Sequence, residues 1–382
     1  MKKSILLFLF LLIFNFVIYA QEIIENPEKP LSKNAGRMLR LQEVFRITDE
    51  SDDFYFKAPQ SLKVDSEGNF LIIDDNQILK FSTDGRFLKN LFKKGQGPGE
   101  ISTRYHGGLS YFLLKNDVFL YDRDGNKIIH MDSKGNLIEE IKLKITRLNE
   151  MYGPGGKEFI FLNESRIDRA KSGFQDVDMS IIAVSKDGSS SKNVFDFPKK
   201  VYWGITSGGE FSVDWARFYG LYDRKTQEIF VSHTDEYKIV LVDLSTGKVI
   251  RSFNRKYPRA KYVMTEGLKR FYQRYKPPEK KHENDVLGLS FHKDQLWIKT
   301  STKDEKKGTL FDVFNKEGKY VDNFYLKLNG TLMTTHGDFI FVLEKDEDEN
   351  LQIVKYKIID GTQIPLSPGS PFTKLDPDFQ GC

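Results

Sequence analysis

The sequence of 382 residues contains a single cysteine, Cys382, so no disulfide within the chain is possible. The fold must therefore be held by packing and hydrogen bonds alone. The six histidines form no HxH or HxxxH pair, which removes the usual spacing of a zinc site. Proline is sparse, with 13 residues against 29 glycines, a balance that suits many tight turns between short strands.

No charge of one sign predominates, because 58 Lys and Arg residues stand against 54 Asp and Glu residues. Nucleic-acid binding needs a concentrated basic face, so we expect no nucleic-acid partner. Motifs of catalysis are also missing. The chain has no GxSxG sequence, and the glycine-rich run 95–99 fits neither GxGxxG nor a Walker loop. We therefore expect binding rather than catalysis.

One apolar run stands out, from Ile5 to Tyr19, directly after a short basic start. With the small residue Ala20 behind it, this pattern predicts a signal peptide over residues 1–20. An uncleaved anchor is the alternative, although a run of about 15 residues is short for a membrane-spanning helix. We expect a periplasmic, cell-surface or secreted protein with no transmembrane segment after cleavage.

A sequence unit recurs along the chain: a β-rich run, a polar turn with glycine, and a second β-rich run. The turn glycines are Gly85, Gly135, Gly188, Gly247, Gly318 and, in a weaker copy, Gly361. Such turns need a residue that tolerates positive φ. Short apolar runs, such as 69–74 and 117–122, precede the turns as expected for central strands. A spacing of roughly 40 to 70 residues is typical of propeller blades.

This repeat predicts an all-β fold, a six-bladed β-propeller of four-stranded blades over residues 38–364, with the first blade starting near Ala58. Residues 38–47 are expected to close the ring by completing the last blade, which lacks a strand of its own. Residues 21–37 are interpreted as a linker and 365–382 as a tail. Insertions are expected at 200–216 and 257–285, the second with a helix over 265–275.

The run KGQGPGE at 94–100, together with the pattern of residues 59–85, resembles an NHL-type repeat. It also resembles six-bladed propellers exported by Bacteroidetes-like bacteria, closely in the first blade and more loosely afterwards. The resemblance implies a propeller for nearly the whole chain after the signal. It implies no single activity, because such families include ligand-binding scaffolds, protein-interaction modules, lactonases and lyases.

Loops that join the last strand of one blade to the first strand of the next gather at one mouth of a propeller channel. We expect a ligand-binding site there, made of Arg104, Tyr105, His106, Tyr202, Trp203, Trp215, Arg217, Arg270 and Arg274. Tryptophan and tyrosine stack on sugars or apolar groups, and arginine pairs with carboxylates. The alternative is that Trp203 and Trp215 pack beneath their own loop.

Asp74 and Asp122 each end a second strand, which is compatible with a channel metal of the kind that six-bladed lactonases hold. We expect no cofactor, with Ca²⁺ at these aspartates as the alternative. The sequence thus predicts an exported, non-catalytic scaffold for a protein, peptide or glycan. A propeller enzyme of the metal-dependent lactonase or lyase type is the alternative function.

Overall fold

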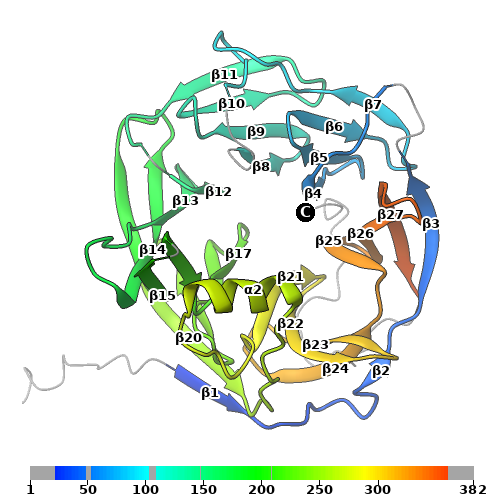
Figure 1. Ribbon diagram of the computed structural model, residues 1–382. Coiled ribbons are helices and arrows are strands. Elements are labelled where there is room, and N and C mark those ends of the chain that lie inside the picture. The colour runs from blue at the N-terminus through cyan, green and yellow to red at the C-terminus, as the bar shows by residue number, and fades with distance from the viewer. Residues whose placement is uncertain (1–21, 49–52, 103–108, 147, 208, 360–382) are drawn as a thin grey trace, which may run out of the picture.

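The computed structural model describes residues 22–48, 53–102, 109–146, 148–207 and 209–359. Their strands form six sheets arranged around a central axis, so the predicted six-bladed β-propeller is confirmed (Figure 1). In each blade the first strand lies nearest the axis and the later strands follow outwards in chain order. No helix in these residues is long and apolar enough to cross a membrane.

The strands are assigned to the blades as follows. Blade one contains β4 (Pro59–Val64), β5 (Phe70–Asp74), β6 (Gln77–Phe81) and β7 (Phe87–Asn90), and blade two contains β8 (Leu109–Leu114), β9 (Asp117–Asp122), β10 (Lys127–Met131) and β11 (Leu137–Lys142). Blade three contains β12 (Glu150–Gly155), β13 (Glu158–Glu164), β14 (Gly173–Ser185), β15 (Ser191–Thr206) and β16 (Gly209–Asp214), and blade four contains β17 (Tyr219–Asp223), β18 (Glu228–Ser232), β19 (Ile239–Asp243) and β20 (Lys248–Arg255). Blade five contains β21 (Val286–His292), β22 (Gln295–Asp304), β23 (Gly308–Phe314) and β24 (Tyr320–Leu326), and blade six contains β25 (Gly330–His336), β26 (Phe339–Lys345) and β27 (Leu351–Ile358).

The hairpin turns repeat from blade to blade as the glycine pattern predicts. The five described turn glycines have φ between 65° and 86°, and Gly361 lies outside the described residues. Gly85 shows a second reason for glycine, because a Cβ there would lie 2.9 Å from the Phe45 ring. A larger residue at this turn would push apart blade one and the strand that closes the ring.

The hydrophobic core lies between the blades. A cluster of buried apolar side chains fills each of the six junctions between neighbouring blades. Central strands are covered on both faces, and all five residues of β5 are buried. Each large apolar side chain buried in this way contributes about 1.5–3 kcal/mol. The ring is therefore stabilised junction by junction, which makes its closure important.

Closure follows the predicted route. Strand β3 (Leu41–Ile47) pairs antiparallel with β27, and the register runs from Leu41 opposite Ile358 to Ile47 opposite Ile353. The N-terminal strand thereby becomes the outer strand of blade six and joins the two ends of the ring. With β3 included, blade six has four strands, as blades one and two have, and the outer edge of β27 is paired.

The segment that we interpret as a linker contains two further strands. Strand β1 (Glu22–Asn26) pairs parallel with β20, and β2 (Arg37–Met38) pairs parallel with β24. Residues 22–47, here called the N-terminal belt, thus cross the outer edges of blades four, five and six in turn (Figure 1). Runs this short show no strand periodicity in the sequence, so only the exposed edges of β20 and β24 decide their conformation.

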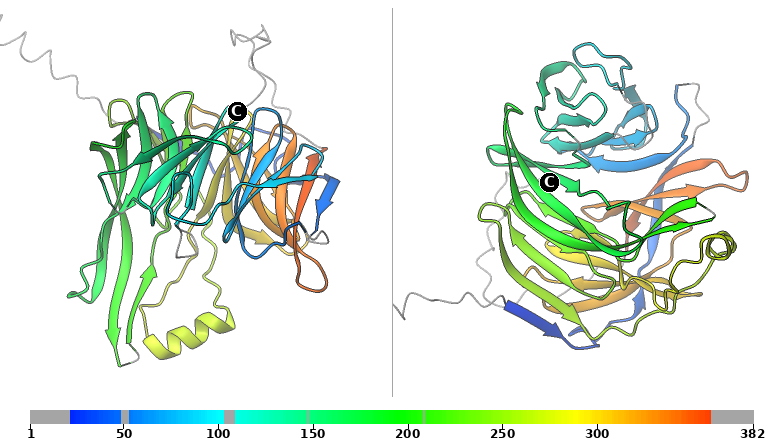
Figure 2. Two further views of the ribbon diagram at one scale, coloured as in Figure 1. Left: turned by 90° about the horizontal axis from the view of Figure 1, so that it is seen from above. Right: turned by 60° about the vertical axis from the view of Figure 1, so that its left-hand side comes forward.

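Both insertions depart from the regular blade, and both stand out from the same face of the ring (Figure 2). Residues 200–216 are an extension of β15 that returns as β16, so they continue the sheet where we expect a loop. Residues 257–285 contain the predicted helix, α2 (Glu266–Tyr275). The Thr265 hydroxyl caps α2 by accepting a hydrogen bond from the Leu268 backbone N–H at 3.3 Å.

Candidate functional site

The two insertions pack against each other and form one projecting lobe. We use "the lobe" for the outer ends of β14 and β15, strand β16, and residues 257–285 with α2. In Figure 2 the hairpin and the helix lie side by side beyond the face of the ring. The Phe211 ring on the hairpin contacts the Phe271 and Tyr275 rings on the helix. The lobe therefore connects the ends of blades three and four with the start of blade five.

The helix turns its apolar side towards the hairpin. Leu268, Phe271, Tyr272 and Tyr275 follow the spacing of one helical face. The ring centroids of Phe271 and Tyr275 lie 5.6 and 5.0 Å from that of Phe211 on β16. Phe211 in turn covers the backbone of Gly204, where a Cβ would lie 2.3 Å from its ring. Glycine at this position of β15 therefore leaves the room that the Phe211 ring occupies.

A continuous row of aromatic rings extends from this contact along the lobe. From Phe211 it passes to Tyr202 at 6.0 Å, then to Phe174 at 5.2 Å and to Trp215 at 4.9 Å. Phe211 is buried, whereas Tyr202 and Trp215 are half-buried and Phe174 remains 46% exposed. A row of contacting rings that is left open to solvent is typical of a binding surface.

The structure separates the two tryptophans that we expect to act together. Trp203 points to the other side of β15, where it is buried. Its Nε1 donates to the Arg169 carbonyl oxygen at 3.2 Å, and the Arg169 guanidinium lies 5.5 Å from its ring centroid. Trp203 therefore packs against the segment between β13 and β14 and not beneath residues 200–216, while Trp215 belongs to the aromatic row.

The root of the lobe is a buried polar cluster that the sequence did not reveal. Lys280 lies in a run that looks like a solvated loop, yet it is buried. Its Nζ donates to the Trp215 carbonyl oxygen at 2.6 Å and to Asn284 Oδ1 at 2.9 Å. Burial lowers the pKa of Lys280. No sequence signal distinguishes this lysine from its neighbour Lys281, which is exposed.

A second set of ion pairs fastens the lobe to blade four. Arg259 pairs with Asp235 at 3.0 Å and with Asp285 at 3.1 Å, and Asp285 also accepts the Tyr237 backbone N–H. Burial raises the pKa of Asp285 to about 6 although the Arg259 guanidinium opposes the shift. These contacts hold both ends of the insertion at fixed places on the ring.

The remaining predicted ligand-binding residues have different surroundings. Arg270 and Arg274 are exposed on α2, and the Arg274 guanidinium lies 5.0 Å from the Tyr275 ring centroid. Arg217 is also exposed, and a hydrogen bond with the Tyr219 side chain raises its pKa. The three other candidates, Arg104, Tyr105 and His106, lie outside the described residues.

The two aspartates proposed for Ca²⁺ each accept hydrogen bonds from the segment that leads into their own blade. Asp74 accepts the backbone N–H groups of Lys57 and Ala58, and burial raises its pKa. Asp122 accepts the backbone N–H and the hydroxyl of Ser102 at 2.8 and 2.7 Å. Each carboxylate thus holds the chain at the entry to its own blade. Within the ranges that the structure describes, no group of three or more His, Cys, Asp or Glu could hold a metal ion.

Two opposite charges on different inner strands interact with each other. Lys63 on β4 and Glu150 on β12 interact electrostatically, while burial lowers the pKa of Lys63 and raises the pKa of Glu150. The Lys63 Nζ lies 5.4 Å from the Tyr111 ring centroid. This pair differs from the acidic and amide ligands of several blades that a lactonase-type channel metal needs.

Comparison with known proteins supports the class of fold that these observations define. The family model DUF5128, described as a 6-bladed beta-propeller, matches residues 39–210, which contain the closing strand, blades one and two, and blade three up to the start of β16. No curated protein matches this chain. The class established by fold and family match is thus a six-bladed β-propeller.

Similar solved structures come from the genus Bacteroides. One, named as a candidate exported protein of Bacteroides fragilis, has 14% identity and a TM-score of 0.52 over 88% of this chain and 100% of its own. Another, a member of the DUF4221 family from Bacteroides vulgatus, has 10% identity and a TM-score of 0.51 over 85% of this chain and 99% of its own. At these identities the likeness concerns the fold alone.

Proposed function

We propose that this β-propeller is an exported, non-catalytic scaffold that binds a protein, peptide or glycan on the lobe. The observation that carries the proposal is the row of contacting rings from Phe211 to Trp215, in which Phe174 is exposed and Tyr202 and Trp215 are half-buried. Aromatic side chains supply most of the energy of many interfaces, because they bury a large area at little cost in entropy. The ion pairs of Arg259 and the bonds of Lys280 hold the row in place before a partner arrives.

Export is supported by the apolar N-terminal run and by the name of the Bacteroides fragilis structure. If the signal is cleaved as proposed, N-terminal sequencing of protein from the cell envelope will begin at Gln21. A chain that keeps Met1 and stays in the cytoplasm would contradict this part of the proposal.

The helix can be removed without cutting into a blade. The two ends of its insertion are already bonded, since the Tyr262 N–H donates to the Lys281 carbonyl oxygen and the Glu283 N–H to that of Ala260, both at 3.0 Å. Replacing residues 263–279 by two glycines should therefore leave the ring intact. The melting temperature of this variant checks that it does.

The binding test compares the complete protein with this helix-deleted variant. A displayed library of short peptides and a glycan array are screened against both proteins. We expect ligands that bind the complete protein and lose most of their affinity for the variant and for Phe174→Ala. Ile138→Ala is the matched control, because Ile138 is a similarly exposed apolar residue on β11, at 53% against 46% for Phe174. If every ligand binds all four proteins alike, or none binds at all, the lobe is not the binding site.

A further inference from the structure

We infer that the partner of the lobe is an acidic protein segment that also carries apolar side chains. This inference rests on the proposed function and specifies the kind of partner. It comes from the distribution of charge, from the position of cations beside the open rings, and from the apolar side chains that the lobe exposes.

Charge is concentrated in the insertion that contains α2. Residues 257–285 hold eight Lys and Arg residues against four Asp and Glu residues, a net charge of +4. The whole chain has the same net charge of +4, so its other residues balance to zero. The exposed cations of the insertion are Lys261, Lys269, Arg270, Arg274, Lys276 and Lys281. With Lys200, Glu210 and Asp214 of residues 200–216 added, the two insertions together keep a net charge of +3, and the basic side chains are concentrated around α2. This basic α2 insertion favours an acidic partner.

Cations also lie directly beside the aromatic row. The Lys200 Nζ is 5.0 Å from the Phe174 ring centroid, and the Arg274 guanidinium is 5.0 Å from that of Tyr275. An extended chain that places an apolar side chain on one of these rings brings its neighbouring side chain within reach of a cation. Acidic and apolar residues close together in sequence would satisfy both contacts.

The same rings are poorly arranged for sugars, which stack on an open aromatic face. Phe174 meets Tyr202 and Trp215 edge to face, at interplanar angles of 72° and 88°. Lys280 lies over the Trp215 ring at 5.7 Å, and Trp203 is buried. The crossed rings and the cations that lie over them leave no flat aromatic surface for a sugar ring. A negatively charged glycan therefore suits the lobe less well than an acidic protein segment.

Apolar side chains beyond the row point to a protein as well. Ile205 near the end of β15 is 52% exposed, and Val263 before α2 is 70% exposed. Branched aliphatic side chains have no planar face for a sugar ring, but they pack well against the apolar residues of a peptide. Val263 and Phe174 give two separate apolar contacts within a basic surface, whereas Ile205 lies on the Trp203 side of β15.

The test measures binding of four defined probes by fluorescence anisotropy. They are a labelled peptide of alternating glutamate and leucine, the same peptide with lysine for glutamate, the same peptide with serine for leucine, and dextran sulfate. We expect the glutamate–leucine peptide to bind on the order of tenfold or more tightly than either other peptide, and its affinity to fall with added salt. The pair Arg270→Glu and Arg274→Glu should weaken binding by a similar factor.

The charge-matched control is the pair Lys306→Glu and Lys319→Glu, which makes the same change in net charge on exposed residues outside the lobe. This control should bind the glutamate–leucine peptide like the unaltered protein. Equal binding of the glutamate and lysine peptides, equal loss in both charge variants, or lobe-dependent binding of dextran sulfate without the peptide would overturn the inference.

Failure of this inference and failure of the proposed function give different results. If the library screen yields ligands that require the lobe but are not acidic, the proposed function stands and the acidic partner is wrong. If no ligand of any chemistry requires the lobe, both fail.

Discussion

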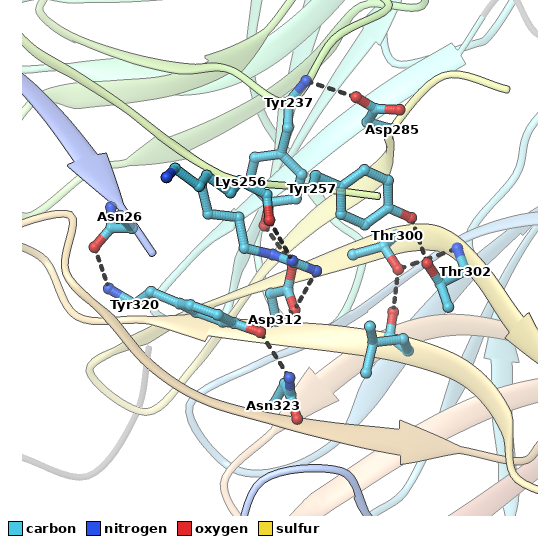
Figure 3. A network of polar contacts seen from close by, with 12 residues as sticks. Asn26, Tyr237, Lys256, Tyr257, Asp285, Thr300, Thr302, Asp312, Tyr320 and Asn323 are labelled. Atoms are coloured by element: carbon cyan, nitrogen blue, oxygen red, sulfur yellow. Dashed lines mark hydrogen bonds and ion pairs between the residues drawn. The ribbon is translucent and has the colours of Figure 1, made fainter. Parts of the chain in front are cut away.

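Asp312 shows how one buried charge is held at a junction between blades. Its carboxylate accepts two bonds from the Arg255 guanidinium, at 2.7 and 3.2 Å, and one from each hydroxyl of Tyr237 and Tyr320, both at 2.8 Å (Figure 3). The guanidinium also lies 4.7 to 5.3 Å from the ring centroids of Tyr237, Tyr257 and Tyr320. Blades four and five are thereby joined by a buried pair of opposite charges.

Removing Asp312 should therefore be costly. Asp312→Ala leaves the Arg255 guanidinium buried without a counter-charge, which typically destabilises a protein by about 3–5 kcal/mol. Urea unfolding measures the loss. Asp84→Ala is the control, since the Asp84–Arg86 pair is exposed and such pairs add little. The interpretation fails if the two variants are equally stable.

His292 gives the protein a sensitivity to acid. Its ring is buried and stacked on Trp297 at 4.1 Å, and its Nδ1 is buried with no hydrogen-bond partner in the described structure. Burial lowers the pKa of His292 to about 4. The unfolded chain therefore takes up the proton first, at its ordinary pKa near 6.5, so stability is lost as the pH falls from about 6.5 towards 4.

His292→Phe should remove this loss, because phenylalanine keeps a stacking ring and has no proton to bind. Between pH 7 and pH 5 the free energy of unfolding of the natural protein should fall by about 2 kcal/mol more than that of the variant. Urea unfolding at the two pH values measures the difference. Parallel pH curves for the two proteins would show that His292 titrates normally.

At the scale of the element, the N-terminal belt protects two strand edges. At the end of β1, the Asn26 side-chain amide bonds through both of its polar atoms. Its Nδ2 donates to the carbonyl oxygens of Asn254 and Gly318, and its Oδ1 accepts the Tyr320 N–H, each at 2.9 Å. Asn26 thus joins the belt to blade four and to blade five. The belt therefore adds a second connection across the junction that Asp312 stabilises.

A protein that begins at residue 39 tests this role, with a protein that begins at residue 22 as the control. The shorter protein loses β1, β2 and the Asn26 bonds, so its melting temperature should drop by about 5 °C or more. The uncovered edges of β20 and β24 should also promote self-association, which light scattering detects. Equal melting temperatures and equal particle sizes would show that the belt neither stabilises the ring nor protects its strand edges.

At the scale of the whole molecule, the ring and the lobe have separate tasks. Stability resides in the six junctions between blades and in the closure of β3 on β27. The lobe lies outside those junctions and is fastened at its root by Arg259 and Lys280. A surface built in this way can change its aromatic and basic residues without altering the packing of the ring, which suits a scaffold whose partner is set by its insertions.

The candidate site could be predicted only in part. Sequence reasoning selected Tyr202, Trp215 and the arginines of α2, because aromatic and basic residues stand out in insertions. It also selected Trp203, which is buried. It did not select Phe174, because buried and exposed residues alternate around it in β14 as they do in an ordinary strand. The pairing register determines on which side of β15 each ring lies. A shift of the register by one residue would exchange the buried and the exposed rings.

The sequence by itself determined the repeat, the turns, the closing strand and the helix. These features depend on neighbours along the chain: glycine at positive φ, apolar residues at strand spacing, and Thr265 ahead of a helical run that ends before Pro277. Only the tertiary structure decided the belt, the burial of Lys280, the bonds of Asp74 and the row of rings across two insertions. Those features depend on groups far apart in the sequence, whose contacts exist only after the blades have assembled.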